Sequence, residues 1–151
     1  MKILVDADAC PVKNIIVKIA KEFKLEVKMF IDTSHVLDDG YSDVITVDKA
    51  RDSVDFAIIG KIELGDAVIT QDYGLAAMAL PKVSFVMNQN GLIFSKDNMD
   101  KLLFERHLSQ EIRRSGGRTK GPKKRGKEDN EKFEAIFRKL VIEQINLNHF
   151  F

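Results

Sequence analysis

The chain has 151 residues, of which 44% are hydrophobic and 31% are charged, and its formal net charge is +1. This length suits one globular domain, and no apolar run is long enough for a membrane span or a secretion signal, because Asp6 and Asp8 interrupt the first one. We therefore expect a cytoplasmic protein. The single cysteine, Cys10, excludes an internal disulfide and a cage of thiolates around a metal.

Charge is divided unevenly along the chain. Residues 1–100 contain 11 Lys and Arg against 16 Asp and Glu, whereas residues 101–151 contain 13 against 7. A basic region joined to an acidic one favours an anionic partner that is presented to a metal-binding site.

The first two thirds of the chain alternate between strand and helix patterns. Short apolar or alternating runs predict strands at residues 2–5, 25–31, 44–47, 66–70 and 83–87. Helical spacing predicts helices that begin at Pro11 and run to Phe23, from about 53 to 62, and over 73–80. This alternation predicts an α/β fold with a mainly parallel sheet and helices on both faces. The Asn90-Gly91 turn predicts a small hairpin with residues 92–94.

The last third of the chain differs in composition. Helices are expected at residues 97–114 and 128–145, the first with an apolar side that includes Leu103, Leu108 and Ile112. We therefore divide the chain into an α/β core at 1–112, a basic flexible segment at 113–127, and a C-terminal helix at 128–151 that packs on the core. All three parts belong to one domain.

The segment 113–127 contains eight Lys and Arg, four Gly and no acid. Such a composition cannot build a core. It is either a solvated linker or a clamp for a phosphate backbone, which it would hold without regard to sequence. The candidate nucleic-acid contacts are Arg113, Arg114, Arg118, Lys120, Lys123, Lys124, Arg125 and Lys127.

Carboxylates follow two of the expected strands and open a helix. Asp6 and Asp8 come after the first strand, and Asp72 follows the strand at 66–70. Asp52 and Asp55 are three residues apart at the start of a helix, where they lie on one face. Because ligands in open α/β sheets bind beyond the carboxyl ends of the strands, we expect these acids to converge there.

Converging carboxylates repel one another and are hard to keep ionised without a cation. Mg²⁺ or Mn²⁺ would supply that charge, since both prefer oxygen ligands. We expect Asp6, Asp55 and Asp72 to hold the metal, Asp8 and Asp52 to assist catalysis or position water, and Thr70 to orient a water or a ligating acid. Metal ions held in this way support phosphodiester hydrolysis.

Each of these acids also has a structural interpretation. Asp8 suits a local role near a helix start, Asp52 and Asp55 suit a capping box, and Asp72 suits the cap of the helix at 73–80. Capping does not explain Asp6, which ends an apolar strand.

The remaining polar candidates are weaker. Asp66 lies at the start of its strand and is expected to be structural. His35, His107 and His149 lack metal-ligand spacing, and Cys10 lacks a partner, so we expect ordinary surface or packing roles for all four.

Five stretches of the sequence resemble the YaiI/YqxD family of bacterial proteins. They are DADACPVK, RDSVDFAI, DAVITQDYGLAAMAL, NQNGLIF and GGRTKGP with the later FEAIFRKL. The resemblance covers nearly the whole chain, and it supplies a family name more readily than an activity.

More distantly, the chain is similar to PIN-like domains, a nuclease architecture with a parallel sheet and acids around divalent metal. The matching positions are Asp6, the helix-start Asp55, and Asp72 with Thr70. The resemblance implies a three-layer α/β/α fold and a metal-dependent nuclease that acts on RNA rather than DNA. The Glu that many PIN domains place on a helix between the first and third acids has no counterpart here.

Two other function classes remain open. The D-x-D after the first strand also resembles haloacid-dehalogenase-type phosphatases, in which the first Asp attacks phosphate, but Ala9-Cys10 replaces their usual Gly-Thr. A non-catalytic RNA-binding module, with acids that only stabilise the fold, is the third hypothesis.

Overall fold

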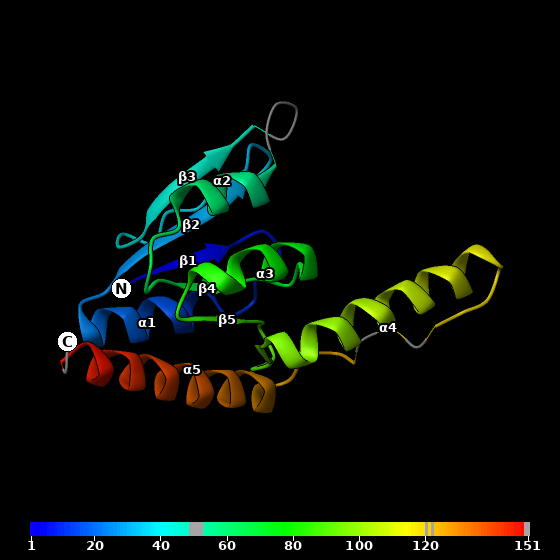
Figure 1. Ribbon diagram of the computed structural model, residues 1–151. Helices are drawn as coiled ribbons and strands as arrows, with labels where there is room; N and C mark the ends of the chain where they lie inside the picture. The colour runs from blue at the N-terminus through cyan, green and yellow to red at the C-terminus, as the bar shows by residue number, and fades with distance from the viewer. Residues whose placement is uncertain (49–52, 120, 122, 150–151) are drawn as a thin grey trace.

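The computed structural model describes residues 1–48, 53–119, 121 and 123–149. Six strands form one sheet in the order β3-β2-β1-β4-β5-β6 (Figure 1). Their bounds are β1 Lys2–Asp6, β2 Glu26–Asp32, β3 Asp43–Val47, β4 Ala67–Ile69, β5 Phe85–Met87 and β6 Ile93–Phe94. Strands β1 to β5 run parallel and β6 pairs antiparallel with β5, which confirms the predicted mainly parallel sheet and its small terminal hairpin.

Helices cover both faces of the sheet. Their bounds are α1 Lys13–Phe23, α2 Val54–Lys61, α3 Tyr73–Ala79, α4 Lys96–Arg114 and α5 Lys127–Asn148, with a short 3-10 turn at Leu80–Lys82. Helices α1 and α5 lie on one face, and α2 and α3 lie on the other (Figure 1). The predicted three-layer α/β/α fold is therefore confirmed, and it is consistent with a PIN-like arrangement.

Strand β1 shows why the sheet is buried on both faces. Ile3 and Val5 point into the core shared with α1 and α5, whereas Leu4 points into the core on the α2 and α3 side. All three side chains are fully buried. Successive side chains of a strand face opposite sides, so a continuous apolar run is what a covered parallel strand requires.

Helix α5 closes the α1 face of the sheet. Phe133, Phe137 and Val141 recur every four residues, and all three are fully buried. The Phe137 ring stacks on the Phe133 ring, with 5.4 Å between the ring centroids. It meets the ring of Phe85 in β5 edge-on, with 6.2 Å between the centroids. The chain's last described helix thus supplies a share of the central core, as its spacing predicts.

Two helices differ from the sequence-based expectation. Helix α1 begins at Lys13 rather than Pro11, which lies in the preceding turn. Helix α4 projects from the body of the molecule, so the side chains of Leu108 and Ile112 are 45% and 44% exposed (Figure 1). The apolar pattern of α4 predicts a helix correctly, but not the surface against which it would pack.

At the amino edge of the sheet, Asp66 forms a buried pair with Lys2. The Lys2 Nζ lies 2.6 Å from Asp66 Oδ2, the Lys2 backbone N–H donates to Asp66 Oδ1 at 3.0 Å, and the Glu63 N–H donates to Asp66 Oδ2 at 2.8 Å. This is the structural role expected for Asp66. None of the helices in the described part of the chain is long and apolar enough to cross a membrane.

Candidate metal and nucleic-acid site

The carboxyl ends of β1 and β4 bring Asp6, Thr70 and Asp72 together. These strands are neighbours, with Val5 opposite Ile69, so Asp6 and Thr70 leave the sheet side by side. The Thr70 hydroxyl donates to Asp6 Oδ2 at 2.9 Å and accepts from the Asp72 backbone N–H at 3.0 Å. Thr70 is only 1% exposed, so its hydroxyl fixes the position of Asp6 relative to Asp72.

Asp72 also caps a helix. It precedes α3, and its Oδ1 accepts a hydrogen bond from the Leu75 backbone N–H at 3.1 Å. The capping interpretation of Asp72 is therefore correct. Capping holds the carboxyl at the helix start, which is also the edge of the sheet where Asp6 lies, so the two roles are compatible.

Asp55 reaches the same place from α2. Burial, then the negative charge of Asp72 and a hydrogen bond with it, and then the charge of Asp6 raise the pKa of Asp55 to about 6. Only carboxyls that lie close together shift one another in this way. Asp6, Asp55 and Asp72 thus lie near enough to influence the ionisation of Asp55, whereas the group of described residues whose ligand atoms all lie within 4.8 Å of one another is Asp8, Asp32 and His35.

The capping-box interpretation of Asp52 and Asp55 is wrong. The residue that caps α2 is Ser53, whose side chain accepts from the Phe56 backbone N–H at 3.2 Å. Asp55 lies in the first turn of this helix. Asp52 lies outside the described residues.

Among the described residues, no cationic side chain is a cause of the pKa shifts of Asp6 and Asp55. The pKa of Asp6 is raised by burial and by the charges of Asp72 and Asp8, against the opposing hydrogen bond from Thr70. Two of the three carboxyls therefore hold their protons to a higher pH than usual. A divalent cation would reverse these shifts, because it would favour the ionised form of every carboxyl around it.

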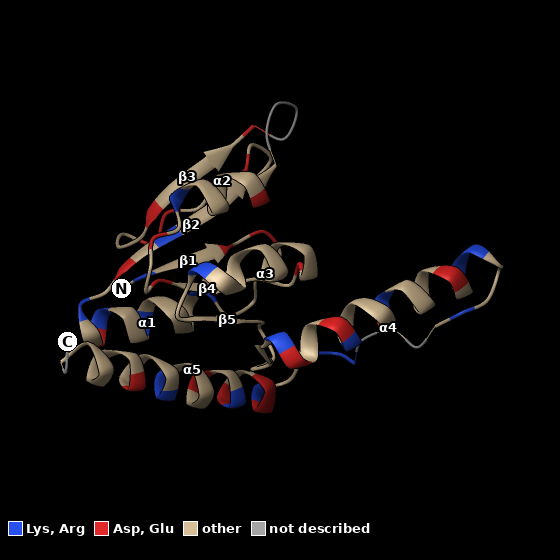
Figure 2. Cartoon of the chain, in the orientation of Figure 1, with Lys and Arg blue, Asp and Glu red and all other residues tan. Residues whose placement is uncertain are grey.

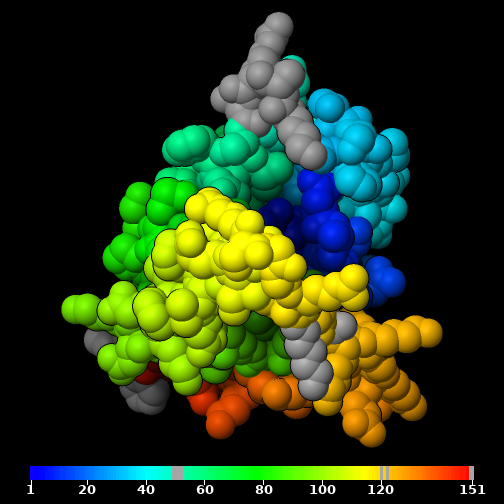
Figure 3. Space-filling view, turned by 90° about the vertical axis from the view of Figure 1, so that its right-hand side faces the viewer, coloured from blue at the N-terminus to red at the C-terminus, as the bar shows by residue number. Residues whose placement is uncertain are grey.

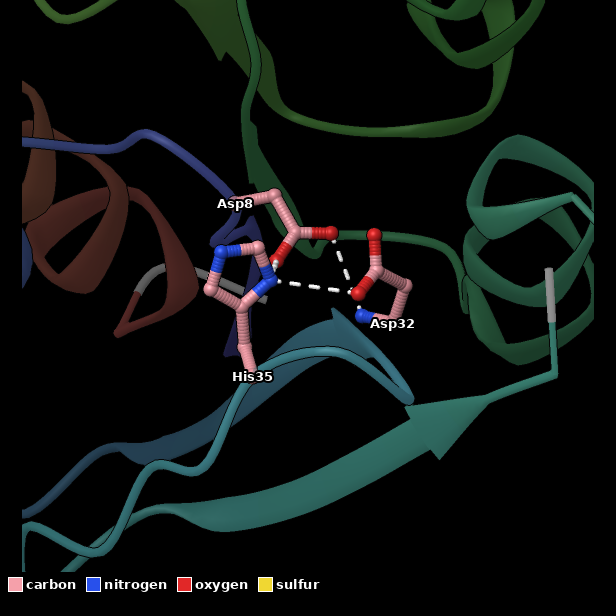
Figure 4. Close-up of side chains that lie close together, drawn as sticks. All are labelled: Asp8, Asp32 and His35. Atoms are coloured by element: carbon pink, nitrogen blue, oxygen red, sulfur yellow. Dashed lines mark hydrogen bonds and ion pairs between the residues drawn. The ribbon is translucent and has the colours of Figure 1, made fainter.

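Asp8 turns away from this cluster and towards β2. Its Oδ2 accepts from the Asp32 backbone N–H at 3.1 Å, and its Oδ1 lies 2.9 Å from His35 Nδ1, which is also 3.1 Å from Asp32 Oδ1 (Figure 4). The contacts of Asp8 therefore join the ends of β1 and β2. Asp8 thus contacts β2 and not the start of α1, whose N-cap is Val12, so the structure does not give it the expected local role near a helix start.

The acid at the end of β2, Asp32, is not among the predicted site residues. Asp32 ends the strand next to β1, so the rule that singled out Asp6 also applied to it. Hydrogen bonds from the Ser34 side chain and backbone hold the pKa of Asp32 well below its usual range. With Asp8 and His35 it forms a group whose ligand atoms lie within 4.8 Å of one another. His35, His107 and His149 are all exposed, as expected, and His35 in addition contacts Asp8 and Asp32.

An open hollow of about 420 Å³ adjoins the acidic cluster. Its lining residues are Asp6, Gln71, Asp72, Tyr73, Asn88, Asn90 and Arg106. Carboxylates therefore line one part of the hollow, amides another, and a guanidinium from α4 a third. The sequence analysis did not single out Arg106, because a lone Arg in a helical pattern gives no sign of where the helix points.

Most of the candidate nucleic-acid contacts are exposed. They lie at the distal end of α4 and on the segment that follows it (Figure 2). The exposed members are Arg113, Arg114, Arg118, Lys123, Lys124 and Lys127. Lys120 lies outside the described residues.

Arg125 differs from the other basic residues, because its guanidinium binds the turn between β5 and β6. It donates to the Gln89 carbonyl and to Asn90 Oδ1, both at 2.7 Å, and to Asn130 Oδ1 of α5 at the same distance. Arg125 therefore joins the turn to α5 through hydrogen bonds. The sequence predicted a phosphate contact for it instead, because it lies in a run of basic residues.

Cys10 is buried beneath this edge of the sheet. Burial raises the pKa of its thiol, which favours the unreactive neutral form. This agrees with the expected packing role.

Residues 4–143 match the family described as "Uncharacterized BCR, YaiI/YqxD family". The chain belongs to the YaiI/YqxD family. Similar proteins include the UPF0178 protein of Ruminiclostridium cellulolyticum, 65% identical over 134 residues that cover 89% of this chain and 88% of that protein. The UPF0178 protein of Clostridium acetobutylicum is 47% identical over 144 residues, which cover 94% and 97% respectively. No solved structure matches.

Three of the stretches that carry the YaiI/YqxD resemblance lie at the carboxyl edge of the sheet. DADACPVK follows β1, DAVITQDYGLAAMAL runs from β4 through Thr70 and Asp72 into α3, and NQNGLIF forms the β5–β6 turn. The segment that contains GGRTKGP leads to Arg125, which binds that turn. These three stretches are far apart in the sequence, but the fold gathers them around the acidic cluster and its hollow.

Proposed function

We propose that this protein is a nuclease that hydrolyses phosphodiester bonds of RNA with the help of Mg²⁺ or Mn²⁺. The observation that carries the proposal is the proximity of Asp6 and Asp72 to Asp55: burial, and then the charges of these two neighbours, raise the pKa of Asp55 to about 6. The resemblance to PIN-like domains, the hollow beside the acids and the exposed basic residues support it.

The chemistry of the donors fits a hard divalent cation. Asp6, Asp55 and Asp72 offer carboxylate oxygens only, and oxygen is the ligand that Mg²⁺ and Mn²⁺ prefer. The pKa values of Asp6 and Asp55 are both raised, and among the described residues no cationic side chain opposes these shifts. These three residues would hold the cation, which would polarise the phosphate and acidify a water.

The protein's own residues prepare this site. Asp55 gives up its proton when the cluster is loaded, and the Thr70 hydroxyl keeps Asp6 and the Asp72 backbone in fixed relation. Gln71 and Asn90 line the hollow and offer amide groups to the sugar and phosphate of a bound strand. Catalysis would then depend on positioning and on charge stabilisation at the phosphate.

A nucleic acid suits the exposed basic residues because it is an anionic chain, and the resemblance to PIN-like domains favours RNA over DNA. Arg118, Lys123 and Lys124 would add salt-sensitive attraction that does not depend on sequence. We place the reaction in the cytoplasm, where a single buried thiol such as Cys10 remains reduced.

The proposal is tested with purified protein, single-stranded RNA and either Mg²⁺ or Mn²⁺. The wild-type protein should cleave the RNA, and Asp6→Asn and Asp72→Asn should each lose at least about 100-fold in rate, because each removes a ligand charge. Asp43→Asn is the matched control, since it removes a carboxylate at the opposite edge of the sheet. Calorimetric titration of Mn²⁺ should show binding to wild type and Asp43→Asn, and much weaker binding to the two site variants.

Equal cleavage by wild type, Asp6→Asn and Asp72→Asn would indicate a contaminant and overturn the proposal. RNA binding without cleavage would favour the non-catalytic RNA-binding hypothesis. Trapping of a phosphoryl group on Asp6 would favour the phosphatase hypothesis instead.

A further inference from the structure

Helix α4 is anchored at one end only. Ser95 and Asn98 form a capping box at its start, and Met99 is buried against the core. Its 19 residues correspond to a length of about 28 Å, and the part beyond the first turns stands clear of the body (Figure 1). Viewed onto the carboxyl edge of the sheet, α4 lies in front of part of that edge (Figure 3).

Two hollows connect the acidic cluster with this helix. The first, described above, contains Asp6 and Asp72, and the second has a volume of about 410 Å³. The lining of the second consists of Tyr73, Leu102, Glu105, Arg106, Ser109, Gln110 and Arg113. Tyr73 and Arg106 belong to both, so the two hollows adjoin and form one path from the carboxylates along α4.

The α4 residues on this path form a single stripe. They are Leu102, Glu105, Arg106, Ser109, Gln110 and Arg113, which follow one another at alternating steps of three residues and one. Residues with this spacing lie on one face of a helix. The path therefore follows the helix for about three turns.

Two guanidinium groups on this stripe are available to a ligand. Within the described part of the chain, no Asp or Glu forms an ion pair with Arg106 or Arg113, although Arg113 donates to the Thr119 hydroxyl at 3.1 Å. Glu105, on the same stripe, forms an ion pair with Lys101 instead, with 3.9 Å between Glu105 Oε1 and Lys101 Nζ. Arg106 and Arg113 are seven residues apart, about 10 Å along the helix axis. Such positions suit two phosphates of one extended strand, because guanidinium groups bind phosphate oxygens well.

We propose that α4 guides single-stranded RNA to the acidic cluster, with Arg106 and Arg113 each binding a backbone phosphate on one side of the cleaved bond. This inference rests on the proposed function. It assigns to α4 a specific task that the exposed lysines and arginines farther along the chain do not share.

The competing interpretation concerns the other side of α4. Phe104, Leu108 and Ile112 recur every four residues on a different face and are largely exposed. A second protein chain could cover this apolar stripe. Position favours the Arg106 face for an RNA ligand. Arg106 lines the hollow that contains the proposed metal ligands Asp6 and Asp72, and Phe104, Leu108 and Ile112 do not.

The test measures binding of a fluorescent 12-residue single-stranded RNA by anisotropy in EDTA, across a series of KCl concentrations. Arg106→Gln and Arg113→Gln should each weaken binding about tenfold and reduce the salt slope by about 0.7. Lys101→Gln is the matched control, since it removes one positive charge from the same helix at a residue that is not a candidate nucleic-acid contact and lines neither hollow. Equal losses in all three variants would overturn the proposal.

A cross-linking experiment tests the same path without relying on affinity. Because Cys10 is buried, a photoreactive maleimide should label only a newly introduced cysteine in the folded protein. Label on Ser109→Cys should cross-link to the RNA, whereas label on His107→Cys, on the far side of the helix, should not. The reverse result, or concentration-dependent cross-links between two protein chains from Ser109→Cys, would overturn the proposal.

The two proposals can fail separately. If metal-dependent cleavage requires Asp6 but is unaffected by Arg106→Gln and Arg113→Gln, the nuclease stands and the guiding role of α4 is wrong. If these two arginines hold RNA that the protein never cleaves, the guiding role stands and the nuclease proposal is wrong.

Discussion

A single hydroxyl joins Thr70 to Asp6, donating to the Asp6 carboxylate at 2.9 Å while it accepts from the Asp72 backbone N–H at 3.0 Å. The two acids come from different strand ends, so their relative position depends on this bridge. Thr70 thereby positions the cluster without contributing a carboxylate to it.

Thr70→Val tests this bridge because valine has nearly the same shape but no hydroxyl. The Asp72 N–H loses its acceptor, so we expect a loss of about 1–3 kcal/mol in the free energy of unfolding, measured with urea. Mn²⁺ affinity, measured by calorimetry, should fall about 10-fold or more, because the ligands lose their support. Thr70→Ser keeps the hydroxyl and should retain most of both properties. Wild-type Mn²⁺ affinity in Thr70→Val would show that the bridge does not position the ligands.

The raised pKa of Asp55 predicts how stability depends on pH in the metal-free protein. Its pKa is about 6 in the folded state against an ordinary value of 3.8, so the stabilising contribution of its bound proton is complete below 3.8. That contribution is lost as the pH rises through about 6, because the unfolded chain releases the proton more readily. In EDTA, the free energy of unfolding of Asp55→Asn should therefore rise relative to that of wild type between about pH 4 and about pH 8. The difference between the pKa values of 3.8 and about 6 sets the upper limit of this rise.

Divalent metal should reverse this trend in the wild-type protein. Mg²⁺ should raise the melting temperature of wild type more at about pH 7.5 than at about pH 5, since Asp55 must lose its proton when the cation binds. The same additions should have little effect on Asp55→Asn. A rise in melting temperature that is independent of pH in both proteins would contradict the assignment of Asp55 as a ligand.

Asp32 predicts the opposite pH dependence at the acid end. Hydrogen bonds from the Ser34 side chain and backbone lower its pKa, so its contribution to stability is present above 3.8 and is lost as the pH falls through the lowered value. Wild type should exceed Asp32→Asn in urea midpoint near neutral pH, and the difference should shrink in strong acid. Asp38→Asn, in the exposed loop nearby, is the control and should show no such convergence. A constant difference at every pH would contradict the prediction.

Arg125 and Lys124 are neighbours in the basic segment for which we predict different roles. Arg125→Gln removes three hydrogen bonds to the β5–β6 turn and α5, and it should lower the free energy of unfolding by about 2 kcal/mol. Lys124→Gln, at an exposed position, should leave stability unchanged. Urea unfolding compares the two, and equal stability of both variants would show that the Arg125 contacts contribute nothing in solution.

The positions of the strand-end acids could be predicted from the sequence, because topology alone fixes them. Asp6 and Asp72 follow neighbouring parallel strands, and any parallel sheet with this order gathers such residues at one edge. The strand-and-helix pattern gives the layers in the same way, since burial on both faces requires continuous apolar runs.

The direction of individual side chains could not be predicted. Asp8 faces the backbone N–H of Asp32, 24 residues away, and nothing in the local sequence of Asp8 indicates that partner. Ser53 rather than an Asp caps α2, because the exact first residue of a helix depends on the loop that enters it. Arg106 approaches the cluster only because α4 leaves the body at a particular angle, which its own pattern does not specify.

The late position of α5 in the chain has a consequence for biosynthesis. Phe133, Phe137 and Val141 cover a sheet face formed by residues that the ribosome makes first, including Ile3 and Val5. Until α5 has emerged, that apolar face is open to water and to other nascent chains. Products that terminate before Lys127 would retain the acidic cluster but not the cover of the sheet, and they should be prone to aggregation and degradation. The apolar face is therefore protected only once α5 has been made and has packed on it.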